Sequence, residues 1–262
     1  MSTRGYTPAI LVDVALFPVN VGLAIACLYL LADVKPGQQP PREKAMLSLV
    51  TVLLGGLALA AILTDGYSFI NYVHLVTSNC GSFSSNLRGF FRDQMLPETL
   101  PIILWCVEGF MLWRTYLYLR HFNQFLLGLF SASLVGLSIW SGSVVLFSRF
   151  GSTNSFEANY HIITISTAVV NLIMTGIIAC RLAIIDAPIY QIFLESGAPL
   201  TLNAILAATV FYPIKGWMSF AVIIMPQIAI LSALLVVYQI ARKDEGVIRL
   251  DERSLAPSDS LP

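Results

Sequence analysis

The chain has 262 residues, of which 56% are hydrophobic and only 11% charged, and its fifteen basic residues balance fifteen acidic ones. Soluble domains carry about 25% charged residues, so this composition excludes an ordinary soluble domain. The balanced charge provides no basic surface for nucleic acid, which excludes that class of partner.

Seven apolar segments, taken in chain order, are long enough to cross a bilayer. A membrane-spanning helix needs about 20 mostly apolar residues. The segments cover approximately 10–32, 45–64, 99–119, 124–147, 160–182, 192–212 and 217–241. Their apolar residues are continuous rather than alternating, which disfavours a transmembrane barrel. The sequence therefore predicts an all-α, polytopic membrane protein with a single seven-helix domain over 1–242 and a disordered polar tail over 243–262.

The distribution of Lys and Arg predicts the orientation of the chain. Basic residues near helix ends are retained on the cytoplasmic side, and with seven spans ten of the fifteen fall on the side that carries the C-terminus. We therefore expect the N-terminus outside and the C-terminus in the cytoplasm, in the plasma membrane or an endomembrane. Aromatic residues after position 65 indicate that the second helix continues past the bilayer or lies on its surface, and the 65–97 connection is the candidate external lid. The alternative is that these aromatic residues form an interfacial belt.

Five polar residues fall near the midpoints of their predicted spans and form the candidate ligand site. They are Asn20, Glu108, Asn171, Asn203 and Gln227. Thr167 joins them, because it lies on the same helix face as Asn171. Polar and ionisable groups are costly in hydrocarbon and usually face the interior of the bundle. The alternative is that these side chains hydrogen-bond to neighbouring helices and only hold the bundle together.

Prolines interrupt three of the predicted spans close to these polar residues. Pro18, Pro199 and Pro226 each free a backbone carbonyl, and a kink beside a polar residue can open a cavity. The fourth span carries a small residue at every fourth position from Gly128 to Gly136, which predicts a close helix contact.

A second polar cluster is predicted near the cytoplasmic face. Arg114 near the end of the third span, Arg181 at the end of the fifth and Glu195 at the start of the sixth share a depth. An ion pair lowers the cost of burying each charge. We expect this ion cluster to clasp the helices together, with a switch between two helix arrangements as the alternative.

Several kinds of chemistry have no residues to carry them. No lysine lies inside a span, so a retinal Schiff base has nowhere to form. The four cysteines are widely spaced and the three histidines lie on different elements, which leaves no zinc ribbon and no zinc triad. Phosphate-binding glycine loops and the motifs G-x-S-x-G and H-E-x-x-H are absent. The sequence therefore predicts neither a metal site nor a cofactor.

Three segments in a fixed order resemble a family of membrane proteins. They read EGFMLWRTY from position 108, NLIMTGIIACR from position 171 and LESGA from position 194. In these segments the chain is similar to seven-span integral membrane proteins of mushroom-forming basidiomycete fungi, over helices two to seven. The resemblance implies the seven-helix fold, a fungal membrane and a shared frame that contains Arg114, Arg181 and Glu195. It implies no activity.

Three functions are compatible with these features. The first is a receptor-like or sensor protein with a midplane cavity for a small lipophilic ligand. Coupling to a G protein is unsupported, because the third span ends in Trp113-Arg114-Thr115-Tyr116 and the last lacks Asn-Pro-x-x-Tyr. The second is a membrane-embedded enzyme on a terpenoid-type lipophilic substrate, possible in secondary metabolism, with Glu108 as proton donor.

The enzyme hypothesis has only one acid at the midplane, Glu108, since Asp13 and Asp65 lie nearer the outer surface. The third function is a small transporter, weakened by the lack of an internal repeat. The expected partners are the lipid bilayer and a small lipophilic ligand.

Overall fold

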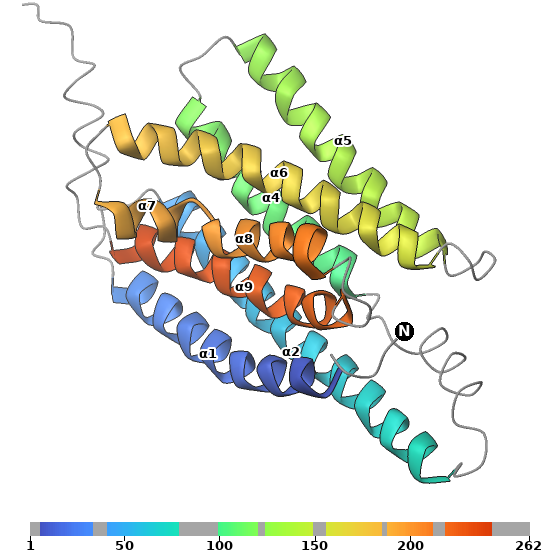
Figure 1. The fold of residues 1–262 in the computed structure, drawn as a ribbon. Coiled ribbons are helices and arrows are strands. Elements are labelled where there is room, and N and C mark those ends of the chain that lie inside the picture. Colours follow the sequence, from blue (N-terminus) through green and yellow to red (C-terminus); the bar gives the residue numbers. More distant parts are fainter. Residues whose placement is uncertain are drawn as a thin grey trace, which may run out of the picture.

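The computed structural model describes residues 6–33, 41–78, 99–119, 124–148, 156–184, 188–211 and 218–242 (Figure 1). These residues are almost entirely helical, and none of them lies in a strand. The elements are α1 (Tyr6–Asp33), α2 (Pro41–Ser78), α4 (Thr99–Leu119), α5 (Gln124–Ser148), α6 (Phe156–Ile184), α7 (Ile189–Glu195), α8 (Ala198–Leu206), the π-helix η3 (Ala207–Phe211) and α9 (Met218–Arg242). The predicted all-α fold is confirmed; the tail over 243–262 lies outside the described residues.

Five of these helices are long and apolar enough to cross a membrane: α1, α2, α4, α6 and α9. Shorter apolar stretches, Gly128–Val144 in α5 and Ala198–Thr209 across α8 and η3, occupy the positions of the fourth and sixth predicted spans. Large apolar side chains such as Leu11 and Leu63 are exposed, while Asn20 and Glu108 are buried. Polar groups inside and apolar groups outside are the arrangement expected of a multi-pass membrane protein.

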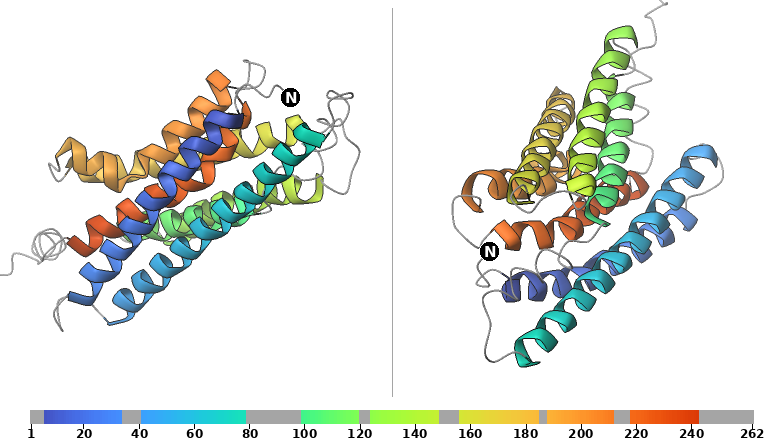
Figure 2. Two further views of the ribbon diagram at one scale, coloured as in Figure 1. Left: turned by 90° about the horizontal axis from the view of Figure 1, so that it is seen from below. Right: turned by 90° about the vertical axis from the view of Figure 1, so that its right-hand side faces the viewer.

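The last helix, α9, lies at the centre of the bundle. Figure 2 shows it between the pair formed by α1 and α2 on one side and the group formed by α4, α5 and α6 on the other. It packs against α1, α2, α4 and α8, and it is the most enclosed of the five candidate spans. Its contacts therefore determine how the two sides of the bundle are held together.

Hydrogen bonds fix the register of α1, α9 and α2. Asn20 on α1 donates to the Oε1 and the backbone oxygen of Gln227 on α9, at 2.7 and 3.0 Å. Gln227 in turn donates to the carbonyl of Ala58 on α2 over 3.3 Å. Seven residues further along both helices, the Cys27 thiol contacts the Leu234 carbonyl at 3.5 Å. Repetition after seven residues shows that α1 and α9 run parallel and stay in contact, as in a shallow left-handed crossing.

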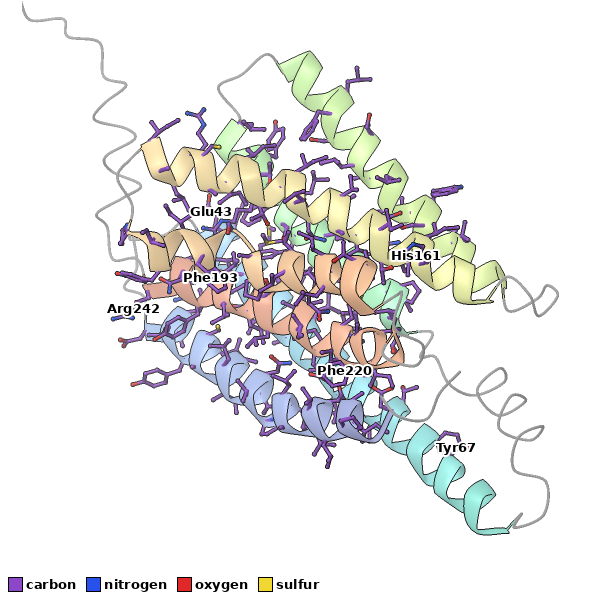
Figure 3. The ribbon with its side chains drawn as sticks, in the orientation of Figure 1. Glu43, Tyr67, His161, Phe193, Phe220 and Arg242 are labelled. Carbon is purple, nitrogen blue, oxygen red and sulfur yellow. The ribbon has the colours of Figure 1, made fainter. Side chains whose placement is uncertain are left out.

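The same register extends one heptad toward the beginning of α1. Asp13 lies seven residues before Asn20, and its carboxyl lies close to that of Asp65, seven residues after the α2 position that meets Gln227. By this spacing, Phe220 is the α9 residue of that layer. Figure 3 shows Phe220 on the side where α1 begins, whereas Arg242 lies on the opposite side with Glu43 and Phe193.

The second predicted helix is expected either to continue past the bilayer or to lie on its surface. In the structure α2 continues without interruption to Ser78, as the first of these predicts. Of the candidate lid predicted over 65–97, residues 65–78 belong to α2 and residues 79–97 lie outside the described residues. The small-residue contact predicted on the fourth span is wrong for the described chain. Gly128 and Gly136 are exposed, and no atom lies within 4 Å of a Cβ built at either position. The small face of α5 points away from its neighbours, because α5 packs on α4 and α6 through its other face.

The prolines have different effects on their helices. Pro18 and Pro226 lie inside helices α1 and α9, which continue past them. Pro199 lies in the first turn of α8, directly after a break at Ser196 and Gly197 that divides the sixth predicted span into α7 and α8. Of the three prolines, only Pro199 therefore accompanies a discontinuity in a span. It is tolerated there because a proline at the start of a helix loses no helical hydrogen bond.

Candidate functional site

Glu108 is the centre of a buried hydrogen-bonded cluster that joins three helices. The Ser138 hydroxyl on α5 donates to its Oε2, and the Asn171 amide on α6 donates to its Oε1 at 3.3 Å. The Thr167 hydroxyl adds a third hydrogen bond from α6, and the Thr167 carbonyl accepts a bond from Asn171 at 2.9 Å. We call these four residues the Glu108 cluster. Since both carboxyl oxygens accept bonds from other helices, the cluster connects α4, α5 and α6.

Ser138 is held in place by a close approach of α5 to α4. The indole Nε1 of Trp105 on α4 donates to the Ser138 carbonyl at 2.9 Å, and the Ser141 hydroxyl donates to the same oxygen at 3.0 Å. Gly142 makes room for the indole, because a Cβ at that position would lie 2.5 Å from Trp105 Nε1. The absence of a side chain at Gly142 therefore lets Trp105 fix the serine that binds Glu108.

Asn20 and Gln227 form a separate polar contact between α1, α9 and α2. Both side chains are fully buried. Among the described residues, the hydrogen bonds join Asn20 to Gln227 and Glu108 to Asn171 but connect neither pair to the other. The predicted midplane residues other than Asn203 thus fall in two separate sites, and in each of them the side chains bind neighbouring helices.

Exchange of Asn20 for leucine is expected to lower the free energy of unfolding by about 1 to 2 kcal/mol, because Gln227 loses its buried donor. Gln227→Leu is expected to have a similar effect. The double variant should be less destabilised than the two single changes combined, because both break one contact. Thermal unfolding in bicelles measures this, with Val19→Ala as the control, since Val19 is exposed beside Asn20. Full additivity would contradict a shared contact.

The break between α7 and α8 is the most irregular backbone among the described residues. Gly197 adopts a left-handed conformation with φ of 74°, and a Cβ there would lie 2.5 Å from the Met111 Cε and 3.7 Å from the Ser232 Oγ. The Thr175 hydroxyl on α6 is 2.7 Å from the Ser196 carbonyl and 2.8 Å from the Thr201 hydroxyl. Non-helical backbone at membrane depth needs such partners, since lipid offers none.

Asn203 on α8 is the remaining midplane residue of the sequence prediction. Its side chain is buried, and its Nδ2 has no hydrogen-bond partner among the described residues. The Ser232 Oγ on α9, next to the break, is likewise buried without a described partner. α8 packs against both α6 and α9. The segment around the break therefore holds two polar groups that the described protein leaves unpaired, in contrast to the Glu108 cluster.

The predicted cytoplasmic ion cluster can be followed only in part. Arg114 on α4 is buried, and Arg181 on α6 is half-buried. Glu195 is the last residue of α7, and its side chain lies outside the described residues. α6 packs against both α4 and α7, so it is positioned between the helices that carry the other two. The clasp stays a prediction.

Sequence reasoning missed Ser138, Trp105 and the contact between Asp13 and Asp65. Ser138 lies in a serine-containing span with no feature that singles it out, so its role depends on the packing of α5 on α4. The aspartate pair did have a signal. Asp13 and Asn20 are seven residues apart, a spacing that places both on one face of a helix in a left-handed crossing.

No protein-family model, no curated protein and no solved structure matches this chain. The resemblance to fungal seven-span proteins therefore stays a prediction.

Proposed function

We propose that this chain is a receptor-like membrane protein that senses a small lipophilic ligand through movement of its broken sixth span. The observation that carries the proposal is the discontinuity at Ser196 and Gly197, where α7 ends and α8 begins. Broken helices in membranes are tolerated where protein or a water-filled cavity replaces lipid. They also provide elements with two arrangements, of the kind that rigid-body and helix shifts use in signalling.

The surroundings of the break support this role for α8. The backbone carbonyl of Ser196, in the break before α8, accepts a hydrogen bond from the Thr175 hydroxyl rather than one from the backbone of a continuing helix. One turn before Thr175 on α6 lies Asn171 of the Glu108 cluster. A shift of α8 would therefore act on α6 at a point directly connected to α4 and α5. At its other end, α8 passes into the π-helix η3, an irregularity often found at functional sites.

Asn203 is the residue that we assign to ligand recognition. Its unpaired amide donor is buried on α8, and an unpaired buried donor is costly unless a partner is supplied. A lipophilic molecule with a carbonyl or hydroxyl oxygen would supply that partner and enter from the bilayer. The Glu108 cluster needs no such molecule, because its donors and acceptors bind one another.

Asn203→Leu is expected to weaken binding of such a ligand by about 2- to 10-fold, the value of one hydrogen bond. The measurement is the ligand-induced rise in melting temperature in bicelles, over a panel of lipophilic alcohols and ketones with matched hydrocarbons. Leu202→Ala serves as the control, since Leu202 is exposed on the same helix. Equal shifts for alcohols and hydrocarbons, or an unchanged shift in Asn203→Leu, would contradict the proposal.

A small transporter is the second candidate, and the same discontinuity favours it. Substrate sites of many transporters are formed by discontinuous helices near the bilayer midplane. Uptake of the stabilising compound into proteoliposomes would distinguish transport from sensing. The enzyme hypothesis is less favoured, because both oxygens of Glu108 already accept hydrogen bonds from α5 and α6. Membership of the fungal seven-span family and residence in a fungal membrane belong to the proposal as well.

A further inference from the structure

Asp13 and Asp65 form a pair of carboxyl groups inside the bundle, on the side where α1 begins. Asp13 is 0% and Asp65 5% exposed. The two carboxyl groups lie close enough to interact with each other. No N–H or hydroxyl of the described residues donates to either oxygen of Asp13 or to Oδ2 of Asp65. Three carboxyl oxygens are therefore buried with no described partner other than the opposing aspartate.

Among the described residues, no positively charged side chain lies beside the pair. α1 packs on α9 and α2, and α2 also packs on α4. In the register of these helices, the α9 residue facing Asp13 is Phe220, which carries no charge. The ionisable side chains of α9 are Tyr238 and Arg242. Those of α4 are Cys106, Glu108, Arg114, Tyr116 and Tyr118. Arg242 lies at the other end of the bundle (Figure 3), and Glu108 is bound to α5 and α6.

Two carboxyl groups in contact cannot both be ionised without a positive charge between them. A proton satisfies the pair with the least rearrangement, because a protonated carboxyl donates to a carboxylate. A metal ion fits less well. In the described part of the chain, no third His, Cys, Asp or Glu joins the pair, whereas metal sites use more ligands than two.

We propose that Asp13 and Asp65 together form a proton-binding site that fastens α1 to α2 and weakens when the proton leaves. With the proton bound, one carboxyl donates to the other and the helices are joined. When water removes the proton, two adjacent carboxylates remain and repel each other. The site is separate from the broken sixth span, so it does not rest on the function proposed above.

The position of the pair gives its proton a short route to water. Asp65 directly follows the uninterrupted apolar run 45–64 of the second predicted span, and α2 itself continues to Ser78. Asp13 lies three residues after position 10, where the first predicted span begins, or about 5 Å along the helix. Tyr67 is exposed on the outside of α2 (Figure 3). The pair is thus buried laterally but close to one end of the membrane-spanning region.

Unfolding of the purified full chain between about pH 5 and about pH 9 tests the site. The folded pair holds one proton that the unfolded chain, with both aspartates ionised, does not hold, so stability falls as pH rises, by up to about tenfold in the folding constant per pH unit. Asp13→Asn or Asp65→Asn removes this dependence, because the amide donates to the remaining carboxylate without titrating. Asp33→Asn, exposed at the other end of α1, retains it.

Infrared spectra provide an independent readout on the same samples. The carbonyl band of a protonated carboxyl is expected in the wild type and is expected to lose intensity in either asparagine variant. If a variant does not fold, the wild-type titration and the disappearance of its band at high pH still decide the matter. An unchanged pH slope in both variants, or an unchanged band, overturns the proposal. Stabilisation of the wild type at high pH by sodium, potassium or magnesium ions, with no protonated band, overturns it in favour of a cation site.

Discussion

Replacement of Gly197 by valine is expected to lower the free energy of unfolding by about 2 to 3 kcal/mol or more. The positive φ of 74° is accessible to glycine, whereas a β-branched residue in that region is a genuine outlier. The added side chain also meets the Met111 Cε, since even a Cβ would lie 2.5 Å from it. Thermal unfolding in bicelles measures the loss. Gly197→Ala should cost less than the valine change, because it adds about 1 to 2 kcal/mol of backbone strain and only the contact of its Cβ with Met111.

A double-mutant cycle separates strain from collision. Met111→Leu removes the terminal methyl group of a buried side chain at small cost, so it should relieve only the collision part of Gly197→Ala. Gly176→Ala is the matched control, because Gly176 lies inside α6 with no atom within 4 Å of a built Cβ. That change should be neutral or slightly stabilising. A Gly197→Val variant as stable as the wild type would show that the break is not required for the fold.

Removal of the Glu108 carboxyl is expected to have the second large effect. Glu108→Ala leaves the Ser138 hydroxyl and the Asn171 amide buried without their acceptor. At about 1 to 3 kcal/mol for each unsatisfied group, the loss should be about 2 to 6 kcal/mol. Glu108→Gln keeps the size and one acceptor oxygen but turns an NH₂ group toward a donor, so it should cost about half as much or less.

The result also distinguishes between two roles for Glu108. If it only connects α4, α5 and α6, combining Glu108→Ala with Ser138→Ala should cost less than the two single changes combined. Ser133→Ala is the control on α5, since Ser133 is exposed and its hydroxyl binds the carbonyl of Leu129 in its own helix. A Glu108→Ala variant that folds normally but loses all ligand response would instead place Glu108 at a binding site.

The helices of this fold could be predicted from the sequence because each is coded by its own residues. Long apolar runs identify α1, α2, α4, α6 and α9 without knowledge of their neighbours. The break at Gly197 could not be predicted in that way. The segment from 192 to 212 reads as one span, and the conformation of Gly197 depends on Met111 of α4 and Thr175 of α6.

The polar residues illustrate the same limit. Depth within a span correctly indicated that Asn20, Glu108, Asn171, Asn203 and Gln227 are buried. The depth of a residue does not tell which neighbouring helix its side chain faces. Depth could therefore not show that Asn20 and Gln227 contact each other while Glu108 faces α5 and α6. The seven-residue spacing along α1 and α9 was present in the sequence, but it predicts contacts only when the two helices are known to be parallel neighbours.

The pairing of the first helix with the last has a consequence for biogenesis. Asn20 and Gln227 are 207 residues apart, so at typical synthesis rates α1 is inserted roughly 10 to 40 s before its main partner exists. During that interval the amide of Asn20 has no acceptor on α9. Asp65 emerges only 52 residues after Asp13, so the carboxyl pair is available to the nascent chain long before the contact between Asn20 and Gln227. Truncations that end before α9 should therefore leave an α1–α2 hairpin in the translocon, open to membrane quality control.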